Sequence, residues 1–146
     1  MSSLENLDRF ARLPPGRRQL LLRAACWVVA VRLALWLVPF RILWGLSQRK
    51  AANQPPTGPV SPADLAWAVR TAGRLVPRAT CLTQALALHK LLRRAGHSCR
   101  VRIGVAKTPG GRLTAHAWVE GDHSALAVGP DAGQFTPLRG LAKELA

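Results

Sequence analysis

The feature that most constrains the fold of this chain is one helical pattern followed by two alternating ones. Residues 80–96 (TCLTQALALHKLLRRAG) lie between an N-capping Thr80 and a C-terminal glycine, and their apolar stripe predicts a helix. The stripe consists of Cys81, Ala85, Leu88, Leu92 and Ala95. Residues 99–106 and 112–120 alternate apolar and polar side chains, which predicts two strands, and ALAV at 125–128 predicts a third. A helix followed by an antiparallel meander is an α+β pattern.

Composition divides the chain into three parts. Residues 1–47 begin with a short polar lead-in and continue, from residue 17, as a strongly apolar stretch. Residues 48–62 (QRKAANQPPTGPVSP) are rich in proline and polar residues, which predicts a linker. Residues 63–146 open with a helical pattern at 63–75 that Pro77 ends. The apolar face of this helix is Leu65, Val69 and Ala72. We therefore expect an apolar helical N-terminal region, a linker and one α+β domain.

Arginines interrupt the apolar stretch at residues 17–47. Eight apolar residues separate Arg23 from Arg32, and eight more separate Arg32 from Arg41. A membrane-spanning helix needs about 18 or more apolar residues, and arginine at its centre costs about 2.5–3.5 kcal/mol. We expect one or two helices that pack on the domain, dock on a partner or lie at a membrane surface. The tryptophans that suit an interface are Trp27, Trp36 and Trp44.

The charge balance favours an anionic partner. The 146 residues are 49 % hydrophobic, which excludes a disordered charged tail. With 21 Lys and Arg against 7 Asp and Glu, the net charge is +14. The excess is spread along the chain, and the sequence contains no tyrosine to stack on bases. We therefore expect no nucleic acid partner, and contact instead with an acidic peptide, a partner protein or the inner membrane surface.

The cysteines indicate a reducing compartment. Cys26, Cys81 and Cys99 are an odd number and too few for a disulfide framework, which predicts a cytoplasmic protein. The chain carries Cys81, His89, His97 and Cys99 in this order, without the CxxC or HxxxH spacings that are typical of a zinc site. We expect no metal and no cofactor.

Cys81 is the candidate nucleophile. It begins its predicted helix, where unpaired N–H groups and the positive end of the dipole favour a thiolate. It also continues the apolar stripe, so a simple packing role stays open. Cys26 lies inside an apolar helix and Cys99 on the inward face of a strand, so both are expected to behave as small hydrophobes.

His116 is the candidate general base. It lies in the middle of a predicted strand, on the face of Trp118 and Glu120, where a histidine needs a partner. Over the start of the helix it would take the proton of Cys81 and later protonate a leaving amine. The other histidines, predicted to lie at the surface, are His89, His97 and His123.

Three acids are candidates for orienting the imidazole. A hairpin turn at residues 122–123 would pair residues whose numbers sum to about 245, which places Asp131 diagonally across from His116. Glu120 shares the face of the histidine but lies two pairs away. Asp122 is better explained as a turn residue. As candidates for orienting the imidazole, the acids therefore rank in the order Asp131, Glu120, Asp122.

Three segments together carry a family resemblance. CLTQALALHKLLRRAG, RIGV and AHAWVE, in this order and spacing, resemble the B2 proteins of lasso-peptide biosynthesis, over roughly residues 63–140. These are small bacterial cysteine peptidases with a transglutaminase-like (papain-like) core. The resemblance implies Cys81 as nucleophile and His116 as base of a Cys-His-Asp triad. Family members often carry the acid where this chain reads Leu126-Ala127-Val128, which leaves Asp131 as the downstream acid.

The resemblance also implies a function and partners. The family removes the leader peptide from a ribosomally made precursor, so that an asparagine-synthetase-like cyclase can close the macrolactam ring. A small separate recognition protein, the B1 protein, holds the leader. Two other functions stay open: a transglutaminase-type acyltransferase that uses the same thiol with an amine acceptor, and a basic non-enzymatic binder of membrane or nucleic acid.

Overall fold

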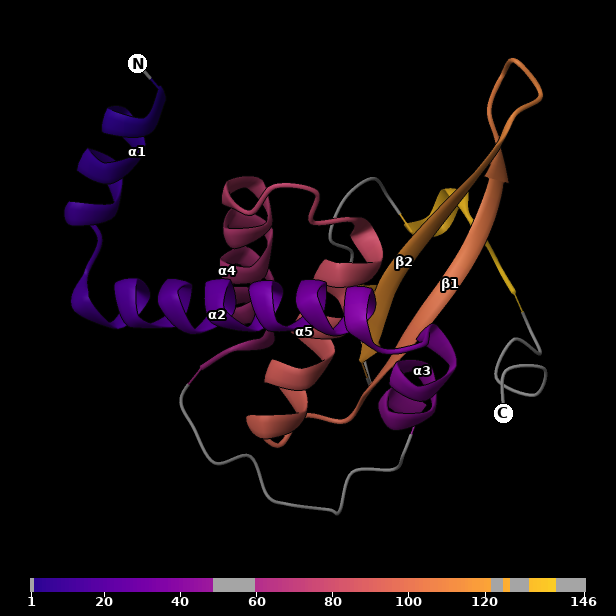
Figure 1. The fold of residues 1–146 in the computed structure, drawn as a ribbon, viewed down its shortest axis with the longest axis horizontal. Helices are drawn as coiled ribbons and strands as arrows, with labels where there is room; N and C mark the ends of the chain where they lie inside the picture. The colour runs from indigo at the N-terminus through magenta and orange to yellow at the C-terminus, as the bar shows by residue number, and fades with distance from the viewer. Residues whose placement is uncertain (1, 49–59, 122–124, 127–131, 139–146) are drawn as a thin grey trace.

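The computed structural model describes residues 2–48, 60–121, 125–126 and 132–138 (Figure 1). The helices are α1 (Ser2–Ala11), α2 (Pro15–Leu37), α3 (Phe40–Gln48), α4 (Pro62–Leu75) and α5 (Cys81–Arg94), with a short 3-10 turn at Ala132–Gln134. The strands are β1 (Cys99–Lys107), β2 (Leu113–Gly121), β3 (Ala125–Leu126) and β4 (Thr136–Pro137). These described elements form the predicted α+β fold, with helices gathered against a small antiparallel sheet.

The sheet has the order β3-β2-β1-β4, with every neighbouring pair antiparallel. β1 and β2 form its long central hairpin, in which Gly104 lies opposite His116. β2 and β3 pair Val119 with Leu126 and Glu120 with Ala125. This is the hairpin register predicted from the turn at residues 122–123, and it is confirmed as far as the described residues extend.

The core lies between the helices and one face of the sheet. α5 packs on β1 and β2 and also against α2 and α4, and α2 crosses in front of α4 and α5 (Figure 1). The buried apolar residues include Leu21, Ala24 and Val28 of α2, Leu65, Val69 and Ala72 of α4, Ala85, Leu88 and Leu92 of α5, and Val101, Ala117 and Val119 of the sheet. The predicted inward faces of α4 and α5 are therefore confirmed. Cys81 and Ala95, at the two ends of the α5 stripe, are partly buried.

Both ends of α5 are capped as the sequence predicts. The Thr80 hydroxyl accepts a hydrogen bond from the N–H of Thr83, at 3.3 Å. At the other end Gly96 has φ 86°, a left-handed conformation that favours glycine, and the next N–H, of His97, donates to the carbonyl of Leu92 at 2.9 Å. The Thr80 cap fixes the start of the helix, where Cys81 is the first residue.

The apolar N-terminal stretch forms two helices rather than one because of a proline. Pro39 disfavours the helical conformation at Val38, which is extended with φ −118° and ψ 134°, so α2 ends and α3 begins after the turn. α2 docks through its buried face and through a cation–π contact in which the guanidinium carbon of Arg94 in α5 lies 5.3 Å from the centre of the Trp27 ring. α2 therefore belongs to the same core as α4 and α5.

Two elements were not predicted. The polar lead-in contains helix α1, in which Arg12 donates to Asp8 one turn earlier, at 2.9 Å. β4, with only two residues, pairs Thr136 with Val105 of β1. Two residues are too few for an alternating pattern, so local sequence gives no signal for such a strand.

His89 and Cys26 correct two predictions. His89, expected at the surface, is only 3 % exposed, because α3 and the sheet cover this side of α5. Cys26, expected to pack as a small hydrophobe, is exposed on α2. His97 is half-buried, with Nε2 at 3.5 Å from the carbonyl of Val60, and His123 lies outside the described residues.

Burial makes His89 an acid-sensitive residue of the core. Its pKa is lowered to about 4, chiefly by burial and further by the positive charges of Arg93 and Lys90. Its Nε2 is buried without a hydrogen-bond partner in the described part of the chain. The neutral imidazole is therefore the form that the folded protein holds at neutral pH.

We expect acid to destabilise the protein through His89. Below about pH 6.5 the unfolded chain protonates this residue while the folded chain does not, so the free energy of unfolding falls by about 3 kcal/mol by pH 4. His89→Gln should remove most of this loss, as measured by urea unfolding at neutral and acid pH. His97→Gln is the matched control and should keep the wild-type acid dependence. An equal acid dependence in His89→Gln and wild type would contradict the assignment.

Candidate active site

Cys81 is the first residue of α5, directly after the capping Thr80. Its thiol is free and partly buried, and it packs against the apolar core. The cap uses the N–H of Thr83, and the N–H of Gln84 donates to the carbonyl of Thr80 at 3.1 Å. The sequence therefore places a thiol, as predicted, at the positive end of the dipole of a capped helix.

The helix start also supplies hydrogen-bond donors beside the thiol. The first N–H groups of a helix have no partner within it. Among the hydrogen bonds of the described residues, none takes the N–H of Cys81 or of Leu82. Amides in this position can stabilise an oxyanion that develops on a carbonyl attacked by the adjacent sulfur.

His116 lies in the middle of β2 and is 4 % exposed. Its ring lies 5.0 Å from that of Phe135 and 6.3 Å from that of Trp118, measured between ring centres. Burial lowers its pKa below the usual 6.5, so the imidazole is neutral at neutral pH. A neutral imidazole is the form that a general base requires.

One nitrogen of His116 lacks a partner. Nε2 is buried and makes no hydrogen bond within the described part of the chain. A buried imidazole nitrogen without a partner is costly and calls for an explanation, and the same holds for Nε2 of His89.

Gly104 shapes the layer around the histidine. A Cβ at this position would lie 2.8 Å from the Trp118 ring and 2.8 Å from the carbonyl oxygen of Thr136. The glycine therefore lets the Trp118 indole and β4 both approach β1 beside His116. Gly104 and Phe135 were not identified as part of the site from sequence. For Gly104 the available signal was a glycine inside the alternating RIGV segment. The sequence around Phe135 contained no comparable signal.

The structure places the two candidate residues on neighbouring elements. α5, which begins with Cys81, packs on β2, which carries His116. Along β2 the side chains alternate: Ala117 and Val119 point into the core with α5, and His116 points to the other face with Trp118. Among the described residues the structure therefore shows no contact between the thiol and the imidazole, and Nε2 of His116 has no hydrogen-bond partner.

Of the three candidate acids, only Glu120 lies within the described residues. Asp131, the first choice, and Asp122, the third, lie outside the described residues. Glu120, the second choice, is exposed, and its carboxylate accepts a hydrogen bond from Nε of Arg102 at 2.8 Å. Glu120 is therefore paired with Arg102, whereas Nε2 of His116 has no hydrogen-bond partner among the described residues. Among the described residues, no group of three or more His, Cys, Asp or Glu has the arrangement to hold a metal ion.

The comparisons with known proteins identify a superfamily. The sequence model described as the transglutaminase-like superfamily matches residues 25–140, which extend from α2 through β4. No curated protein and no solved structure matches the chain. Members of this superfamily are typically cysteine-dependent enzymes of the papain-like peptidase and acyltransferase kind. A thiol at a capped helix start and a buried histidine on the adjacent strand fit that chemistry, and the chain belongs to the transglutaminase-like superfamily.

Proposed function

We propose that this protein is a cysteine peptidase that removes the leader from a lasso-peptide precursor. The observation that carries the proposal is Cys81 at the capped start of α5, packed on the strand of the buried His116, in a chain of the transglutaminase-like superfamily. The lasso precursor as substrate rests on the resemblance of the CLTQALALHKLLRRAG, RIGV and AHAWVE segments to the B2 proteins.

The proposed reaction is acyl transfer to water. The Cys81 sulfur attacks the carbonyl carbon of the peptide bond between leader and core, and the N–H of Cys81 donates to the oxygen that becomes negative. His116 takes the thiol proton and gives it to the departing core amine, which leaves the leader as a thioester on the sulfur. Water then attacks the thioester with His116 as base, which releases the leader acid and restores the thiol.

Asp131 is proposed as the residue that orients the imidazole. A carboxylate bound to one ring nitrogen fixes the tautomer and leaves the other nitrogen to act as the base. Nε2 of His116 is buried and has no partner among the described residues. It is therefore the nitrogen that would donate a hydrogen bond to such a carboxylate. Asp131→Asn should reduce the rate less than loss of the histidine, because an orienting residue is partly dispensable.

The proposed partners follow from the same resemblance. A small leader-recognition B1 protein presents the precursor, and an asparagine-synthetase-like cyclase receives the released core peptide. The net charge of +14 favours contact with an acidic leader or an acidic recognition protein.

The experiment that tests the proposal distinguishes water from an amine as the acceptor of the acyl group. The full-length protein is incubated with the lasso precursor from its own genome neighbourhood, the recognition protein and a labelled primary amine, and the products are weighed by mass spectrometry. Free leader acid and free core peptide are the expected products. Labelled leader would assign a transglutaminase-type acyltransferase instead, and an intact precursor would overturn the proposed substrate.

A further inference from the structure

α2 is apolar on two separate faces. One face carries Leu21, Ala24 and Val28, which are buried in the core. The other carries Leu22 and Leu33, which are 53 % and 51 % exposed, and it ends at Trp36 and Leu37, which are 78 % and 73 % exposed. Residues 22, 26, 29, 33 and 36 recur at spacings of four and three, so this exposed stripe runs along one side of the helix.

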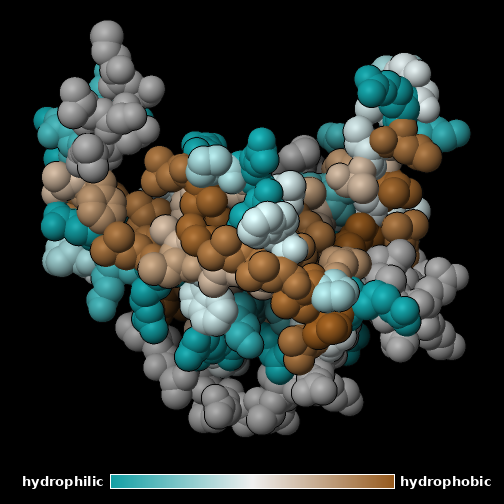
Figure 2. Space-filling view, in the orientation of Figure 1, coloured by the Kyte–Doolittle hydropathy of each residue, from teal (hydrophilic) through white to brown (hydrophobic). Residues whose placement is uncertain are grey.

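α3 extends the stripe into a broader surface. Its Ile42 and Leu46 are also exposed, after the turn at Pro39 changes the direction of the chain. We call the exposed apolar residues of both helices the α2–α3 face; they are Leu22, Val29, Leu33, Trp36, Leu37, Ile42 and Leu46. Figure 2 shows apolar side chains gathered along α2 and over α3 on one side of the molecule. An exposed apolar surface made by two helices at an angle marks an interaction site.

The charge around this surface has one sign. Residues 9–50, which contain both helices, include nine Lys and Arg and no Asp or Glu. Arg23 is exposed on α2 beside the apolar stripe. An apolar face bordered by basic residues and ending in an exposed tryptophan is typical of helices that lie in the interface of an anionic membrane.

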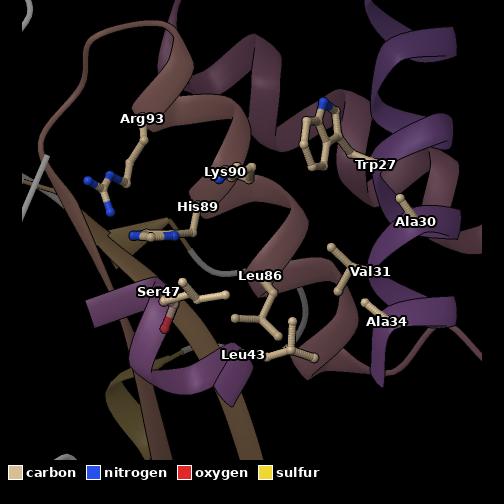
Figure 3. Close-up of a pocket in the computed structure, with 11 residues that line it drawn as sticks. Trp27, Ala30, Val31, Ala34, Leu43, Ser47, Leu86, His89, Lys90 and Arg93 are labelled. Carbon is tan, nitrogen blue, oxygen red and sulfur yellow. The ribbon is translucent and has the colours of Figure 1, made fainter. Parts of the chain in front are cut away.

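A pocket of about 280 Å³ between α2, α3 and α5 adjoins the α2–α3 face (Figure 3). Trp27, Val31 and Leu86 give it apolar walls, and Leu46 of the α2–α3 face also lines it. Lys90 and Arg93 of α5 also line it and bring positive charge, and Arg93 lies on the side away from α2 (Figure 3). Apolar walls with basic groups at one side fit an acyl chain that carries an anionic headgroup.

We propose that the α2–α3 face docks on an anionic phospholipid bilayer, with α2 lying in the plane of the interface. α2 is long and apolar enough to cross a membrane by length and composition. Crossing would withdraw Leu21, Ala24 and Val28 from the core that they share with α4 and α5. Lying in the interface keeps these contacts and buries the exposed side of the same helix. The inference does not rest on the proposed peptidase activity.

Vesicle flotation of the full-length protein tests the proposal. We expect the protein to float with vesicles of phosphatidylcholine mixed with phosphatidylglycerol, and to float less with phosphatidylcholine alone or at high salt. Leu33→Glu should lower the bound fraction at least about tenfold, because it places a charge in the centre of the α2–α3 face. Trp36→Glu, at the most exposed position, should act in the same way and serves as the second variant if Leu33→Glu does not fold.

The matched control is Leu113→Glu, which makes the same change at a leucine that is 69 % exposed at the far end of the β1–β2 hairpin. It should float like the wild type. Failure of the wild type to float, or equal flotation of all variants, would overturn the proposal. So would a stable dimer in vesicle-free solution, measured by light scattering, that Leu33→Glu converts to a monomer, because a second copy would then be the occupant of this face.

Discussion

Cys81→Ala is expected to lower the rate of precursor cleavage at least about 10³-fold while the protein stays folded. The rate falls because no other group can form the thioester, and the helix-start amides alone stabilise only the oxyanion. The fold is retained because the side chain is partly buried and the cap of α5 belongs to Thr80 and Thr83, which the substitution leaves intact. Cleavage is followed by mass spectrometry and folding by urea unfolding of the same samples.

The chain offers a matched control for this experiment. Cys26→Ala removes a thiol that is exposed on α2, outside the proposed site, and should cleave at the wild-type rate. Retained cleavage by Cys81→Ala would exclude this residue as the nucleophile. Equal loss in both variants would point to general damage by thiol removal and would equally contradict the assignment.

The parts of the fold that the sequence predicted well depend on short-range physics. Periodicity gave the inward faces of α4 and α5, and Thr80 and Gly96 gave the ends of α5 because capping involves only adjacent turns. The turn at residues 122–123 gave the register of β2 with β3 because a hairpin register follows from its loop. Cys81 and His116 were selected as candidates by the same means, since each was chosen by its place on one element.

The predictions that were wrong concern residues whose burial depends on how separate elements pack together. His89 lies on the side of α5 that the helical pattern leaves polar, and only the packing of α3 and the sheet on that side makes it buried. Cys26 is exposed because the buried face of α2 is set by its docking on α4 and α5, not by the composition of the helix. Phe135 reaches His116 from a segment far along the chain. A pattern within one element contains none of these long-range contacts.

His116→Ala is expected to lower kcat/KM for cleavage by about 10²–10⁴-fold, the range for loss of a general base. Because burial lowers its pKa, the wild-type enzyme should keep its activity as the pH falls to about 6.5 and lose it only below that. The variant should lack this fall in activity at low pH (the acid limb of the pH profile), since the group that titrates is gone. His97→Ala, at the opposite end of α5, is the control and should keep both the rate and the limb.

The acid limb must be separated from unfolding, because two buried histidines act in the same direction. His89, with a pKa of about 4, makes the folded protein less stable in acid whatever the chemistry of the site. Measuring kcat/KM in a His89→Gln background, with tryptophan fluorescence recorded at each pH, removes that contribution. An acid limb that persists in this background and disappears on adding His116→Gln identifies His116 as the titrating base. A limb that disappears with His89→Gln alone would show that it reports unfolding, and His116 would lose its assignment.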